Sequence, residues 1–196
     1  MTRLLSGTAL AAAALAAILF LPILGLRLLA CLVAVLAARE YLGIVHSGRP
    51  VARGPLLLLV VMTCWWMSDP GQMRVLPLLL VGLAWLAAEV LFRGRTVDQA
   101  AARFLAPWYV GMPLGMLAAV QGLGGPRATL LLMATIVVSD SGQYYTGRAF
   151  GRRPLAPAIS PKKTVEGALG GLVLATSFIV LAGPGVFPIA GRLSLA

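Results

Sequence analysis

Charge is scarce in this sequence of 196 residues. Charged side chains make up 11% of it, against roughly 25% in soluble globular domains, whereas hydrophobic residues make up 60%. Acidic residues are the scarcest, with six Asp and Glu against 16 Lys and Arg. This composition, with a mean hydropathy of +0.93, excludes an ordinary soluble domain and predicts an integral membrane protein.

Residues that bind metals or form disulfides are also few. The two cysteines, Cys31 and Cys64, lie in apolar stretches without a CxxC or Cys/His pattern, which indicates small core residues. The single histidine, His46, lies beside a Gly-Arg-Pro turn and is read as a solvated loop residue. The sequence contains no GxxxxGK[ST] or dinucleotide fingerprint, so any phosphate site must be built on membrane helices.

Apolar windows separated by Gly, Pro and Arg breakers fill most of the chain. A helix needs about 20 residues to cross a bilayer core of about 30 Å. The windows are residues 5–25, 28–45, 55–67, 75–92, 104–120, 128–145 and 167–182. They predict an all-α fold: one polytopic membrane helix bundle, residues 1–196, with about seven transmembrane helices.

Basic residues predict the orientation of this bundle. Counting by alternate loops, twelve fall on the side of the N-terminus: Arg3, Arg39, Arg49, Arg53, Arg93, Arg95, Arg103, Arg148, Arg152, Arg153, Lys162 and Lys163. Four fall on the other side: Arg27, Arg74, Arg127 and Arg192. The positive-inside rule therefore predicts a cytoplasmic N-terminus. It also explains the net charge of +10 without nucleic acid, and no nucleic-acid partner is expected.

Residues 139–167, called here the polar segment, hold most of the reactive polarity. Asp140 lies late in an apolar window, and Gln143, Tyr144 and Gly147 fall on its helical face at i+3, i+4 and i+7. A carboxylate, an amide and a phenol on one face favour a cation or a nucleotide over lipid. The alternative is that Asp140 only pairs with Arg148.

A second element of the polar segment predicts a phosphate site. Ser160 followed by Pro161 is typical of a helix start, with the hydroxyl as N-cap. Lys162 and Lys163 would then lie in the first turn, where the helix dipole disfavours cations unless an anion binds there. The alternative is a solvated Lys pair that only sets topology.

Two ordered blocks, which cover most of the polar segment and extend just beyond it, resemble the bacterial phosphatidate cytidylyltransferase family, the CDP-diacylglycerol synthases. They are residues 139–152, SDSGQYYTGRAFGR, and residues 155–171, LAPAISPKKTVEGALGG. Residues 39–41 resemble the end of an early helix in that family, and residues 3–7 resemble its usual opening.

The resemblance implies a reaction and its residues. Phosphatidic acid attacks the α-phosphorus of CTP, and CDP-diacylglycerol and pyrophosphate form with Mg²⁺ as cofactor. Asp140, Lys163 and Glu166 would be catalytic, and Asp140 and Glu166 would bind the metal. The nucleotide would be held by Tyr144, Ser160, Lys162, Lys163 and Thr164. A bacterial inner-membrane protein with cytoplasmic active-site loops is expected, and the same resemblance implies a homodimer.

The sequence departs from the family in one respect. The later family signature, a Pro-Gly-His-Gly-Gly segment followed by Asp-Arg-x-Asp, supplies metal-binding carboxylates and does not occur in these 196 residues. A truncated family member is therefore expected. The alternatives are a non-catalytic homologue that binds nucleotide or lipid and a CTP-dependent polyprenol kinase, which shares a Lys-Lys-Thr-x-Glu-Gly-like block.

Overall fold

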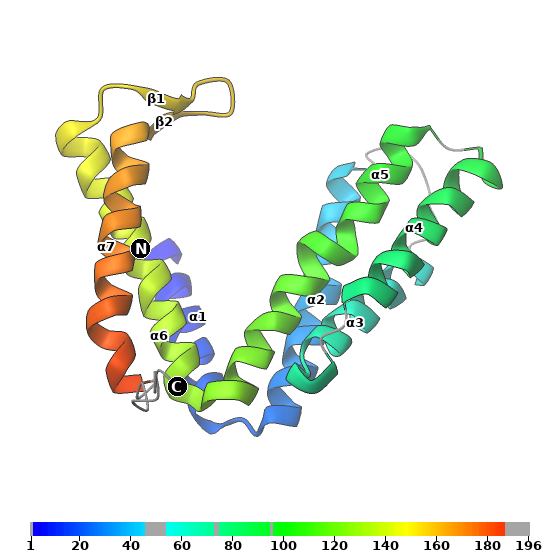
Figure 1. Cartoon of the computed structure of the whole chain (residues 1–196), viewed down its shortest axis with the longest axis horizontal. Helices are drawn as coiled ribbons and strands as arrows, with labels where there is room; N and C mark the ends of the chain where they lie inside the picture. Colours follow the sequence, from blue (N-terminus) through cyan, green and yellow to red (C-terminus); the bar gives the residue numbers. More distant parts are fainter. Residues whose placement is uncertain (1, 46–53, 73–74, 95, 187–196) are drawn as a thin grey trace, which may run out of the picture. The chain divides into compact units, whose positions relative to one another are not determined.

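A computed structural model describes residues 2–45, 54–72, 75–94 and 96–186 of the chain. Almost all of this part is helical, with one β-hairpin (Figure 1). The chain divides into two compact units, residues 1–123 and 124–196. The expectation of a single domain stays a prediction.

Each apolar window of the first unit coincides with helix. Helix α1 is Thr2–Phe20, α2 is Ile23–Val45, α3 is Gly54–Met67, and α4 is Val75–Leu91. A 3₁₀ turn, η1 (Pro70–Gln72), precedes α4. Helix α5 (Val97–Ala106) continues through a π turn, η2 (Pro107–Gly111), into α6 (Met112–Phe150).

Three helical stretches are long and apolar enough to cross a membrane: Ile23–Val45, Val97–Phe150 and Val165–Val186. Leu5–Phe20, Gly54–Met67 and Val75–Leu91 are shorter apolar helices. An all-α membrane protein is therefore confirmed, although a hairpin was not expected. The count of seven spans and the orientation stay predictions. The predictions for His46, Arg49, Arg53, Arg74, Arg95 and Arg192 concern residues outside the described ranges.

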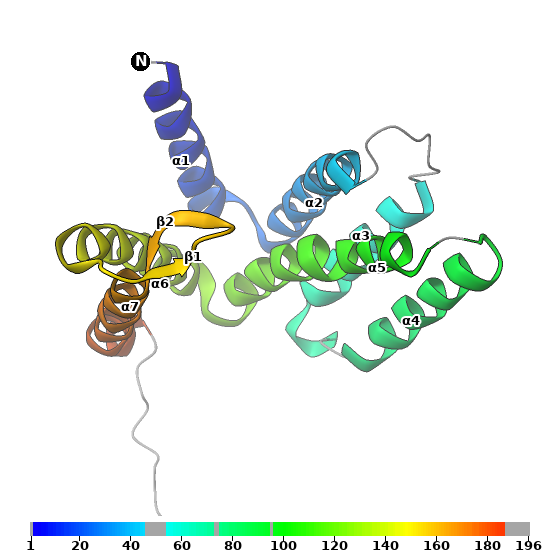
Figure 2. The same ribbon diagram turned by 90° about the horizontal axis from the view of Figure 1, so that it is seen from above.

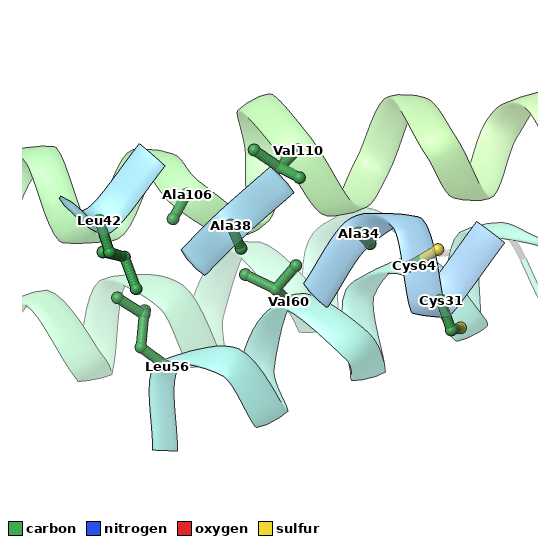
Figure 3. Packing of buried hydrophobic residues seen from close by; sticks show 9 residues of the cluster. All are labelled: Cys31, Ala34, Ala38, Leu42, Leu56, Val60, Cys64, Ala106 and Val110. Carbon is green, nitrogen blue, oxygen red and sulfur yellow. The ribbon is translucent and has the colours of Figure 1, made fainter. Parts of the chain in front are cut away.

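Small and branched side chains form the core of the first unit (Figure 3). The cluster joins α2, α3, α5 and η2 through Cys31, Ala34, Ala38, Leu42, Leu56, Val60, Cys64, Ala106 and Val110. Both cysteines are thus buried core residues, as predicted, and they form no disulfide. A Cβ placed on Gly111 would lie 2.7 Å from the carbonyl oxygen of Val60, so glycine allows the helix backbones to approach closely.

A buried ion pair joins α4 to α5. Nε of Arg103 lies 3.2 Å from Oε2 of Glu89, and each residue is 1% exposed. Arg93, which is half exposed, lies 3.1 Å from the other oxygen, Oε1. The i, i+4 spacing of Glu89 and Arg93 is typical of such a pair on one helix, whereas no local spacing connects Arg103 on α5 to Glu89 on α4.

The second unit begins at a sharp break in α6. Gly125 has φ 68° and ψ −171°, and Pro126 follows it, so a Gly and Pro breaker separates windows 104–120 and 128–145 as expected. After α6 come strand β1 (Pro154–Ala156), strand β2 (Ser160–Thr164) and helix α7 (Val165–Val186). Helix α7 lies beside the last part of α6 in both views (Figures 1 and 2).

Glycines let α6 and α7 pack closely. A Cβ on Gly171 would contact Cγ of Gln143 and lie 2.8 Å from the carbonyl oxygen of Ser139. A Cβ on Gly142, in the facing helix, would lie 3.2 Å from Cα of Gly171. Small residues at a helix–helix contact permit this close approach of the two backbones.

The ion pair generates a stability prediction. Arg103→Met should lower the free energy of unfolding by about 3–5 kcal/mol, because it leaves a buried carboxylate short of a partner. Arg93→Ala, at the exposed partner, should cost less than about 1 kcal/mol. Unfolding of the purified protein in mixed micelles measures both. An equal loss in the two variants would contradict the assignment, and the double variant Glu89→Leu/Arg103→Met should recover most of the loss.

The contact between α6 and α7 generates a second prediction. Gly171→Ala should lower the free energy of unfolding by about 1–3 kcal/mol through overpacking. Gly183→Ala is the matched control on the same helix, because the nearest atom to its added Cβ, Cγ2 of Ile179, is 3.8 Å away. That variant should be neutral or stabilising by about 0.5–1 kcal/mol. Thermal unfolding in detergent measures the stability of both variants. A neutral Gly171→Ala would contradict the close packing of α6 against α7 at this position.

Candidate functional site

A cavity of about 580 Å³ lies in the second unit, lined by residues of α6 and β2. The lining residues are Asp140, Gln143, Tyr144, Gly147, Arg148, Ser160, Lys162, Lys163 and Thr164. Three basic side chains thus share the cavity with one carboxylate. Such a surface suits a polyanion that carries a cation.

Helix α6 supplies the wall that contains the carboxylate. Asp140, Gln143, Tyr144 and Gly147 all line the cavity, which confirms the face predicted from the i, i+3, i+4 and i+7 spacing. Nη1 of Arg148 donates a hydrogen bond to the hydroxyl oxygen of Tyr144 at 3.3 Å. Since that oxygen accepts from Arg148, the phenol proton of Tyr144 can point to a ligand.

A short hairpin supplies the other wall. Strands β1 and β2 pair antiparallel, with Pro154 opposite Thr164 and Ala156 opposite Ser160. The N–H of Ile159 donates to the carbonyl of Ala156 at 3.0 Å, and Pro157 occupies the second position of this turn, where proline is favoured. The hairpin holds Lys162 and Lys163 in an extended strand.

The predicted helix start at Ser160 is therefore wrong. Helix α7 begins five residues later, and Oγ1 of Thr164 caps it by accepting a hydrogen bond from the N–H of Gly167 at 3.2 Å. Ser160 belongs to β2 because its backbone pairs with β1. Lys162 and Lys163 consequently lie before the helix, and the predicted conflict with the helix dipole does not arise.

The cavity gathers six of the seven residues proposed for the site. Asp140, Tyr144 and Lys163 line it together with Ser160, Lys162 and Thr164. Sequence reasoning did not assign Arg148 to the site and considered it only as a partner for Asp140. Its position eight residues after Asp140, two helical turns along the same face, could have identified it.

Glu166 occupies a different place from the other proposed residues. Its Oε2 accepts hydrogen bonds from the backbone N–H groups of Arg152, at 3.0 Å, and Arg153, at 3.2 Å. It does not belong to the described residues that line the cavity. Its carboxylate therefore binds the connection between α6 and β1.

The metal-binding capacity of the site rests on Asp140. Within the described ranges no group of three or more Asp, Glu, His or Cys side chains could hold a metal ion. Mg²⁺ does not require such a cage, since it is commonly bound by one or two carboxylates together with substrate phosphates and water. One carboxylate beside basic side chains fits a metal that arrives with a nucleotide.

Comparison with known proteins assigns the chain to a family. The sequence model of the "Cytidylyltransferase family" matches residues 1–187. A phosphatidate cytidylyltransferase of Staphylococcus haemolyticus is 30% identical over 171 residues, covering 82% of this chain and 65% of that protein. A phosphatidate cytidylyltransferase of Bacillus subtilis is 40% identical over 82 residues, covering 41% of this chain and 30% of that protein.

A third relative, a phosphatidate cytidylyltransferase of Haemophilus influenzae, is 56% identical over 48 residues, which cover 24% of this chain and 17% of that protein. In these alignments the chain spans less than two thirds of the length of each curated relative. The family match, in contrast, extends over nearly the whole chain. The chain therefore belongs to the cytidylyltransferase family.

Proposed function

We propose that this chain transfers the cytidylyl group of CTP to phosphatidic acid in phospholipid biosynthesis, forming CDP-diacylglycerol and pyrophosphate. The observation that carries the proposal is that Asp140, on one wall of the cavity, faces Lys162 and Lys163 on the other. The relatives of this chain are named phosphatidate cytidylyltransferases. A phosphate oxygen of the lipid attacks the α-phosphorus of CTP. The bond from that phosphorus to the bridging oxygen breaks, and pyrophosphate leaves with the electron pair.

The basic and the hydroxyl side chains of the cavity have different roles in this reaction. Lys162, Lys163 and Arg148 bind the phosphate oxygens of CTP and stabilise the charge that develops on the leaving pyrophosphate. The hydroxyl groups of Ser160, Thr164 and Tyr144 orient the nucleotide by hydrogen bonds. Positioning and charge neutralisation are sufficient, so the reaction needs no covalent enzyme intermediate.

Asp140 is the residue that would hold magnesium. When bound, Mg²⁺ neutralises phosphate charge and so favours attack at phosphorus. Asp140 contributes one hard oxygen ligand, and the nucleotide phosphates contribute others. Glu166, the second metal ligand expected from the resemblance, is bound to the N–H groups of Arg152 and Arg153.

The setting of the site follows from topology. We propose that about seven helices cross the bacterial inner membrane with the N-terminus in the cytoplasm, as the basic residues predict. Arg148, Lys162 and Lys163 then lie on the cytoplasmic side, where CTP is available. Membrane lipid and phosphatidic acid are the remaining partners, and a homodimer stays an expectation from the resemblance.

A second candidate is a homologue that binds nucleotide without turnover. It is favoured by the single carboxylate in the cavity and by the lack of a three-acid cluster among residues 2–45, 54–72, 75–94 and 96–186.

Membranes that contain the chain can be given phosphatidic acid, Mg²⁺ and CTP labelled on either the α- or the γ-phosphorus. Lipid label from α-labelled CTP alone supports cytidylyl transfer. Lipid label from the γ-phosphorus would identify a lipid kinase, and nucleotide binding without label would identify the non-catalytic homologue.

Loss of one lysine should weaken nucleotide binding. Lys163→Ala removes a charge-assisted contact to phosphate, so lipid labelling should fall at least about tenfold and the CTP concentration for half-maximal rate should rise. Arg39→Ala, on the exposed surface of α2, removes the same charge elsewhere and is the control. Equal effects of the two substitutions would mean that Lys163 contributes only general positive potential.

The role of Asp140 can be tested without turnover. Asp140→Asn should abolish the increase in CTP affinity that Mg²⁺ produces, because the amide is a poor ligand for the ion. CTP affinity in EDTA should change little or improve, since a negative charge is removed near the phosphates. Titration calorimetry with and without Mg²⁺ measures both. A variant that keeps the full effect of Mg²⁺ excludes Asp140 as the metal ligand.

A further inference from the structure

The carboxylate of Glu166 fastens the chain that leaves α6. Helix α6 ends at Phe150, and the N–H groups of Arg152 and Arg153 both point to the same oxygen, Oε2 of Glu166. Hydrogen bonds from N–H groups to a carboxylate are roughly twice as strong as bonds between neutral groups. The end of α6 is thus bound to the first turn of α7 at a point 13 or 14 residues away in sequence.

A second bond strengthens the same junction. The N–H of Val165 donates to the carbonyl of Arg153 at 2.9 Å. Arg153 therefore donates to Glu166 and accepts from Val165, so both of its backbone polar groups bind the start of α7. Pro154 and Thr164, the next residues on either side, form the first pair of the hairpin.

This junction is the base of the hairpin that contains the lysines. Lys162 and Lys163 are separated from Val165 by only one or two residues, and both line the cavity. The hairpin is short, and an isolated two-stranded hairpin is at best marginally stable in water. Its position over α6 consequently depends on the bonds at its base.

The location of Glu166 favours this role over metal binding. Two backbone donors already bind Oε2, and the cavity lining includes Asp140 but not Glu166 among the described residues. An acidic residue in the first turn also interacts favourably with the helix dipole of α7. Glu166 can therefore be stabilised in its charged form without any metal.

We propose that Glu166 is a positioning residue, which holds the hairpin so that Lys162 and Lys163 stay at the cavity, and that it does not itself bind metal. The part of this proposal that concerns the nucleotide rests on the proposed function. Glu166 acts on CTP only through the two lysines. Loss of Glu166 should therefore weaken CTP binding by displacing the lysines and leave the Mg²⁺ dependence of binding unchanged.

Two substitutions separate the alternatives. Glu166→Gln keeps an amide oxygen that can accept both backbone hydrogen bonds, whereas Glu166→Ala keeps no acceptor. In hydrogen exchange, the amides of Arg152 and Arg153 should exchange at least about tenfold faster in Glu166→Ala. In Glu166→Gln they should remain within about threefold of the wild-type rate.

CTP affinity is a second measurement, and it would not change if Glu166 only stabilised the fold. CTP affinity in EDTA should fall about tenfold in Glu166→Ala and recover largely in Glu166→Gln. The Mg²⁺ concentration for half-maximal enhancement should be unchanged in Glu166→Gln. Asp98→Ala, which removes an exposed acid from the first turn of α5, is the matched control and should alter neither exchange nor binding.

Each opposite result has a distinct meaning. A Glu166→Gln protein with protected amides but without Mg²⁺ enhancement would overturn the proposal and make Glu166 a metal ligand. Unchanged amide exchange in Glu166→Ala would contradict the claim that Glu166 holds the base of the hairpin. A wild-type protein that binds no CTP would overturn the proposed function and the nucleotide role, while the exchange result would still decide whether Glu166 fastens the hairpin.

Discussion

The close approach of α6 and α7 is the contact on which the candidate site depends. A Cβ on Gly167 would lie 2.8 Å from the carbonyl oxygen of Gln143, and a Cβ on Gly170 would collide with Thr146. Only glycine lets the backbone of α7 approach α6 so closely at these positions. Since α7 begins directly after β2, this contact also determines where the lysine-bearing strand lies relative to Asp140.

Acidic groups are few in this chain, and the structure gives three of the six a distinct environment. Glu89 is buried between Arg93 and Arg103 and joins two helices. Glu166 binds backbone N–H groups at the base of the hairpin. Asp140 lines the cavity. Charge near a bilayer is costly unless it is paired or functional, and Asp140 is the carboxylate among the described residues that line the cavity.

Local patterns predicted the helices and one wall of the site well. Apolar windows mark most of the helices, although residues 97–103 of α5 lie in none of them. The spacing from Asp140 to Gly147 identified the cavity face of α6 because helical periodicity is a local property. The start of α7 was predicted wrongly at Ser160. Both Ser160 and Thr164 are acceptable N-caps, and the choice between them depends on pairing with β1, which a local capping rule does not consider.

Composition and periodicity alone establish a helical membrane protein, because burial in lipid restricts a chain to few charges and continuous helices. The partners of individual polar groups were decided only in three dimensions. Glu89 pairs with Arg103 fourteen residues later, and Glu166 binds N–H groups thirteen and fourteen residues earlier. Such partners depend on how helices and hairpin pack, and no local spacing rule encodes that packing.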